Sequence, residues 1–154
     1  MIQNLHDNTT SANLTKKYEH YEKQGHLILS VTLSTYIKSA MYAASDRMRH
    51  FWDQHFIRRV QKRLPKQLVF DHDWIVEKSP DGYFHFHGFI AVIREYAFRL
   101  WNDNHLNKRL TRDLYSFRSA GKYRPFRLNS FLIEPVNSVV AWSTYITKEN
   151  INEA

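Results

Sequence analysis

The chain has 154 residues, which suffice for one domain with a continuous core but not for two. Its composition, 43% apolar and 15% aromatic with no cysteine, excludes a disordered protein, disulfide bonds and thiolate metal sites. The 22 Lys and Arg residues exceed the 15 Asp and Glu residues and give a net charge of +7, which favours a polyanionic partner.

The first residues are polar, and we expect a flexible arm over 1–25, with space for a short helix at its end, before a folded domain over 26–154. No apolar run approaches the length of a membrane span, so we expect no membrane partner and a location in the cytoplasm, in a bacterial host.

Hydrophobic periodicity predicts strands where apolar residues alternate and helices where they recur every third or fourth position. In chain order these are a strand over 27–34, a helix over 41–64, strands over 68–77 and 83–93, a helix over 95–112, a strand over 127–136 and a helix from Asn137 or Ser138 to 149. This order predicts an α+β fold of ferredoxin-like or RRM-like kind, an antiparallel sheet with helices on one face.

Two histidines in the strand over 83–93 suggest a metal site. His85 and His87 are two apart, so their imidazoles project to the same face of the strand. The turn before this strand predicts a hairpin, and if Glu77 pairs with Tyr83, Glu77 lies diagonally across from His85. Asp73, opposite His87 in that register, is the reserve ligand.

The histidine pair by itself has an alternative interpretation. With nine histidines in the chain, chance supplies about half of one His-x-His pattern. Two partly exposed, hydrogen-bonded strand histidines would give the same sequence.

The last helix carries a second candidate. Tyr145, Lys148 and Glu149 are three and four positions apart and share a helix face. A tyrosine phenol is a poor nucleophile near neutral pH because its ordinary pKa is about 10, but a metal and a nearby cation would activate it against a phosphodiester. A packed aromatic beside a solvated helix end is the alternative.

The segment over 108–127 mixes basic and aromatic residues. Single-stranded DNA offers a charged backbone and bases that stack, and this composition suits both. The candidate contacts are Lys108, Arg109, Arg112, Arg118, Lys122, Tyr123, Arg124 and Arg127. A solvated loop with its aromatic residues in the core is the alternative.

Together these features resemble the HUH single-strand DNA endonucleases, specifically the single-tyrosine initiators of rolling-circle replication. Residues 29–33 resemble the first family motif, His85-Phe86-His87 matches the metal motif, and Tyr145 with Lys148 matches the Tyr-x-x-Lys motif. The resemblance implies Glu77 as the third metal ligand, with Glu149 able to assist.

The resemblance also implies an activity. A divalent metal, Mg²⁺ or Mn²⁺, would serve Tyr145 as it nicks and joins single-stranded DNA or an origin hairpin through a 5′-phosphotyrosine. Lys148 would contact the phosphate, and a host helicase and polymerase would act with the protein in replicating a plasmid, phage or other virus. The alternatives are a single-tyrosine HUH transposase, which cuts transposon-end hairpins, and a non-catalytic module that binds single-stranded nucleic acid.

Overall fold

The computed structural model describes residues 2–3, 10–36, 49–63, 69–94, 105–116, 126 and 131–152. Its elements in chain order are β1 (Ile2–Gln3), α1 (Ser11–Lys23), β2 (His26–Ser34), η2 (Phe51–Ile57), α3 (Arg58–Arg63), β3 (Val69–Lys78), β4 (Phe84–Ile93), α5 (His105–Ser116), β5 (Leu132–Pro135) and α6 (Val139–Asn152). The element η2 is a π-helix that leads directly into α3.

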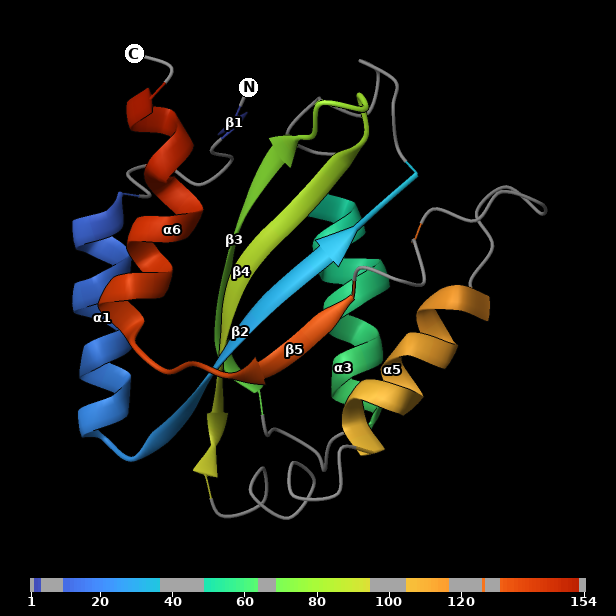
Figure 1. Ribbon diagram of the computed structural model, residues 1–154. Coiled ribbons are helices and arrows are strands. Elements are labelled where there is room, and N and C mark those ends of the chain that lie inside the picture. The colour runs from blue at the N-terminus through green and yellow to red at the C-terminus, as the bar shows by residue number, and fades with distance from the viewer. Residues whose placement is uncertain are drawn as a thin grey trace.

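The strands form one antiparallel sheet in the order β1-β3-β4-β2-β5. The central strand β4 pairs with β2 over 85–93 and with β3 over 84–92, and β5 and the two-residue β1 form the edges (Figure 1). The α+β class and the antiparallel sheet are as the sequence predicts.

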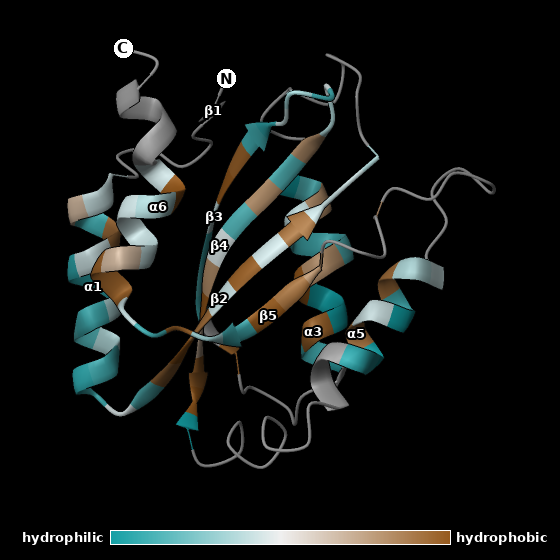
Figure 2. Cartoon of the chain, in the orientation of Figure 1, coloured by the Kyte–Doolittle hydropathy of each residue, from teal (hydrophilic) through white to brown (hydrophobic). Residues whose placement is uncertain are grey.

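Helices cover both faces of this sheet, so the prediction of helices on one face is wrong. The helices α1 and α6 lie together on one side, and α3 and α5 lie on the other (Figure 1). Two separate core clusters result, and β4 contributes Phe86 to one and Phe89 to the other, both fully buried. A strand that is apolar on both sides requires a cover on both sides. Hydrophobic residues accordingly concentrate on the strands, while hydrophilic residues predominate on α1 (Figure 2).

The prediction of a flexible arm over 1–25 is wrong for its described part, because α1 packs on the sheet. Thr10 caps this helix by accepting a hydrogen bond from the Asn13 backbone at 3.1 Å. Tyr18 is fully buried and stacks on Phe89 with ring centroids 4.3 Å apart. The apolar face of α1 consists of few residues between many charged ones, so the composition of this segment does not reveal that it packs on the sheet.

The β3–β4 hairpin has a register two residues away from the predicted one. Glu77 pairs with His85, and Ile75 pairs with His87. The loop over 79–83 accounts for the difference, because it closes with the Ser79 backbone donating to the Tyr83 carbonyl oxygen at 2.8 Å. A shift of two preserves the faces, so Glu77 stays on the histidine face and comes directly opposite His85.

The remaining elements follow the predicted order with shifted bounds. The predicted helix over 41–64 is described from residue 49, and α5 is described from His105 and continues beyond the predicted end. Ser138 caps α6 by accepting from the Ala141 backbone at 3.1 Å, as predicted. In the part of the chain that the structure describes, no helix is long and apolar enough to cross a membrane.

Candidate metal centre and neighbouring tyrosine

Three side chains meet where β3 and β4 approach the hairpin loop. The Oε2 atom of Glu77 lies 3.1 Å from Nε2 of His85 and 3.6 Å from Nε2 of His87. All three potential ligand atoms are within 4.8 Å of one another, so this group can hold a metal ion. Their side chains are 14%, 15% and 8% exposed, which leaves the group shielded but reachable.

The donor set suits a divalent cation. Two donors that bind one metal at about 2.1 Å, with roughly 90–110° between the bonds, lie about 3.0–3.4 Å apart. The distances from Glu77 to the two imidazoles are close to this spacing. Two imidazole nitrogens and a carboxylate oxygen are ligands that several divalent metals accept.

Hydroxyl groups fix the other nitrogen of each histidine. Nδ1 of His85 lies 2.7 Å from Oγ of Ser79, and Nδ1 of His87 lies 3.4 Å from Oγ1 of Thr32. Such partners orient metal-binding imidazoles. Neither residue is among those that the sequence predicts for the site, although the polar face of the strand over 27–34 is a signal for Thr32. Only the pairing of β2 with β4 places Thr32 opposite His87.

The surroundings of His85 favour its neutral form. Burial lowers the pKa of His85, the neighbouring His87 lowers it further, and the Glu77 carboxylate opposes both effects. A neutral imidazole has the lone pair that a metal requires.

The helix α6 brings Tyr145 to this group. The rings of Tyr145 and His87 have centroids 5.7 Å apart and are nearly perpendicular, and Tyr145 is 58% exposed. Tyr145 also stacks on Trp142 at 5.4 Å, and the Trp142 ring lies 5.8 Å from His87. The indole nitrogen of Trp142 donates to the Gly88 carbonyl oxygen at 2.8 Å and so ties α6 to β4. Trp142 is not among the residues that the sequence predicts for the site.

Among the other predicted metal ligands, Asp73 is the one whose side chain the structure describes, and it is not part of this group. Asp73 lies four residues from Glu77 along β3, about 13 Å at strand spacing, and accepts hydrogen bonds from Lys17 and Tyr18 at 2.8 Å. The structure thus places Glu77, and not Asp73, beside the two histidines. Lys148 and Glu149 belong to α6, but their side chains lie outside the described residues.

The basic segment over 108–127 is described over 108–116 and at Phe126, which is buried in the core. Lys108, Arg109 and Arg112 are exposed on α5, which packs on the sheet face opposite the histidines. The remaining candidates, Arg118, Lys122, Tyr123, Arg124 and Arg127, lie outside the described residues.

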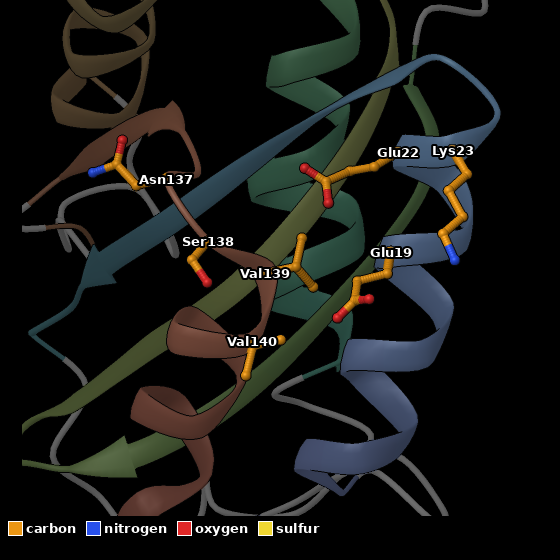
Figure 3. Close-up of a pocket in the computed structure, with 7 residues that line it drawn as sticks. All are labelled: Glu19, Glu22, Lys23, Asn137, Ser138, Val139 and Val140. Atoms are coloured by element: carbon orange, nitrogen blue, oxygen red, sulfur yellow. The ribbon is translucent and has the colours of Figure 1, made fainter.

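A separate pocket of about 260 Å³ lies at the start of α6 (Figure 3). Glu19 and Glu22 of α1 line it beside Ser138 and Val139. Carboxylates near the first turn of a helix stabilise it by interaction with the helix dipole. This pocket therefore has a structural explanation in the docking of α1 on α6.

A scan against protein-family models finds no match, and a search of curated proteins finds no significantly similar sequence. Function must therefore be inferred from the residues and their geometry.

Proposed function

We propose that this protein nicks and joins single-stranded DNA through a covalent bond to Tyr145, with a divalent metal, Mg²⁺ or Mn²⁺, held by His85, His87 and Glu77. The observation that carries the proposal is the contact between the exposed Tyr145 and His87, the buried member of a partly buried His-His-Glu group. The setting we propose is rolling-circle replication of a plasmid or virus by an initiator of the HUH family.

The residues divide the chemistry between them. A cation held by the three ligands would polarise a phosphate oxygen and make the phosphorus more electrophilic. The Tyr145 oxygen forms a bond to phosphorus, and its proton passes to solvent or a nearby base. The bond from phosphorus to the 3′ oxygen breaks, and that oxygen keeps the electron pair and takes up a proton. The product is a 5′-phosphotyrosine and a free 3′-hydroxyl.

The reverse reaction joins strands. Because the phosphotyrosine bond conserves the energy of the phosphodiester, a 3′-hydroxyl can attack the phosphorus and release Tyr145. The exposure of Tyr145 supports this role, since a strand can approach the phenol from solvent. Lys148 lies one helical turn further along α6, and we propose that it contacts the phosphate.

The test is the capture of a covalent product. Incubated with a randomised pool of single-stranded oligonucleotides and Mn²⁺, the wild type should form a protein–DNA band that survives denaturing electrophoresis and disappears with EDTA. Sequencing the trapped strands would locate the cleaved bond.

The matched variants are Tyr145→Phe and Tyr115→Phe, which each remove one hydroxyl from an exposed tyrosine. Tyr145→Phe should abolish the covalent band while DNA binding remains, and Tyr115→Phe should leave it unchanged. An adduct that persists in Tyr145→Phe would refute the nucleophile. Binding that is insensitive to EDTA, with no adduct from the wild type, would instead indicate a non-catalytic binding module.

A further inference from the structure

Two tyrosines meet beyond the ends of β2 and β4, near the metal ligands. Tyr36 follows β2 and Tyr83 precedes β4, and their rings are perpendicular with centroids 5.9 Å apart. Tyr36 is 44% exposed. The proposed displacement at phosphorus by Tyr145 does not involve this aromatic pair.

The register places the aromatic pair on the histidine face. Ser34 pairs with His85, and the next residues, Thr35 and Phe84, are buried and joined by hydrogen bonds from Thr35 to the Phe84 carbonyl oxygen. Phe84 belongs to the core on the opposite face. Successive residues of a strand alternate between faces, and continuing this alternation one residue past Thr35 and Phe84 puts Tyr36 and Tyr83 on the histidine side, about 7 Å beyond His85 at strand spacing.

The proposed metal ligands thus lie between Tyr145 and the pair formed by Tyr36 and Tyr83. Tyr145 contacts His87, the ring of His87 lies 4.7 Å from that of His85, and Tyr83 comes two residues before His85. A phosphate at the ligands would have the nucleophile on one side and the aromatic pair on the other.

In-line displacement assigns a direction to this arrangement. The entering and leaving oxygens lie on opposite sides of phosphorus, so the nucleotide with the leaving 3′ oxygen extends away from Tyr145. We propose that Tyr36 and Tyr83 stack the base immediately 5′ of the cleaved bond. This inference rests on the proposed function of Tyr145 and the metal ligands.

The aromatic pair would therefore hold the strand that ends in the new 3′-hydroxyl. Stacking on an aromatic ring tolerates any base, so the pair contributes affinity and position rather than sequence readout. A retained 3′-hydroxyl can attack the phosphotyrosine, so loss of the pair should impair joining more than cleavage.

The experiment uses the full chain with Tyr145→Phe, so that bound DNA stays intact, and with Mn²⁺. The probe is a single-stranded oligonucleotide recovered from the trapped pool, with 2-aminopurine immediately 5′ or immediately 3′ of the mapped bond. Binding should quench the fluorescence of the 5′ probe, because stacking quenches 2-aminopurine. Adding Tyr36→Ala should remove this quenching and weaken binding roughly tenfold, while Tyr36→Trp should retain both.

The matched control is Tyr115→Ala, which removes a ring of similar exposure, 41%, from α5 on the other side of the sheet. It should leave the quenching of the 5′ probe unchanged, because α5 lies on the other side of the sheet from the metal ligands. In chains with Tyr145 intact, Tyr36→Ala should reduce joining of an added 3′-hydroxyl strand more than it reduces adduct formation.

Two results would overturn the inference while the proposed function stands. One is a wild type that forms the adduct while Tyr36→Ala behaves like Tyr115→Ala. The other is quenching confined to the 3′ probe, which would show that the aromatic pair stacks the base 3′ of the cleaved bond. Failure of the wild type to form any adduct would refute the proposed function itself.

Discussion

Ser79 shows how much of the candidate metal centre depends on a residue that binds no metal. Its hydroxyl lies 2.7 Å from Nδ1 of His85, and this contact fixes the imidazole with Nε2 toward Glu77. Ser79 belongs to the hairpin loop, whose conformation also sets the β3–β4 register. One loop residue therefore influences both the orientation of a ligand and the strand pairing that brings the ligands together.

We expect Ser79→Ala to weaken Mn²⁺ binding by about 10- to 100-fold, the usual effect of losing a residue that orients a metal ligand. Isothermal titration calorimetry would measure the affinity, with Ser116→Ala, an exposed serine on α5, as the control. An unchanged affinity in Ser79→Ala would show that the hydrogen bond does not position His85.

At the scale of the element, α1 illustrates a helix held by charge as well as by apolar packing. Lys17 forms ion pairs with Asp71 at 2.9 Å and Asp73 at 2.8 Å, and the Tyr21 hydroxyl donates to Asp71 at 2.6 Å. Burial alone would raise the pKa of Asp71, but the bonds from Tyr21 and Lys17 lower it below its ordinary value. These contacts attach α1 to β3, which also carries the proposed metal ligand Glu77.

The pKa of Asp71 predicts acid sensitivity of this attachment. A carboxyl group with a lowered pKa in the folded state contributes stability that is complete above its unfolded pKa of about 4 and is lost as the pH falls through the folded value. Tyr21→Phe removes one of the bonds responsible. Urea unfolding should therefore show Tyr21→Phe to be less stable than the wild type at neutral pH, with a difference that shrinks below about pH 4.

Three titratable groups of the described residues lie near Asp71: Lys17 of α1 pairs with it, Asp73 shares that lysine, and His72 donates its backbone N–H to Asp71. Because His72 titrates in both proteins, its contribution cancels in the difference. A difference in the free energy of unfolding between the wild type and Tyr21→Phe that stays constant down to pH 3 would contradict the role of Asp71.

At the scale of the whole molecule, the sheet lies between the candidate metal centre and the basic residues of α5. His85, His87 and Tyr145 lie with α1 and α6 on one face, and the basic residues of α5 lie on the other. A DNA strand that reaches both must pass around an edge of the sheet. The basic side chains of α5 can therefore aid binding without touching the reacting phosphate.

Combined alanine substitution of Lys108, Arg109 and Arg112 should weaken binding of single-stranded DNA. If each contacts one phosphate, the slope of log affinity against log salt should fall by about 2. The rate of adduct formation at saturating DNA should not change, since these residues do not touch the site. Fluorescence anisotropy and single-turnover gels would measure the two quantities, and a large fall in the saturating rate would contradict this placement.

Much of the fold was predictable because the signals are local. The alternation over 27–34 predicts β2, and the parity of His85 and His87 places both imidazoles on one face. The helical layers were not predictable in the same way, because α1 buries Leu14 and Tyr18 among many charged neighbours. The hairpin register also depended on the conformation of one loop.

The sequence by itself determined which residue types can form the site: two histidines of equal parity, a nearby carboxylate and a tyrosine on a late helix. Only the tertiary structure decided that Glu77 lies opposite His85, that Thr32 reaches His87 and that Tyr145 contacts the same imidazole. The physical reason is that the face to which a side chain points depends on the period of its own strand, whereas strand register and helix docking depend on packing between distant segments. Gly88 shows the second kind of dependence, on packing between distant segments. A side chain at this position would collide with the Asp73 carbonyl and the Trp52 indole, and no local sequence pattern reveals this constraint.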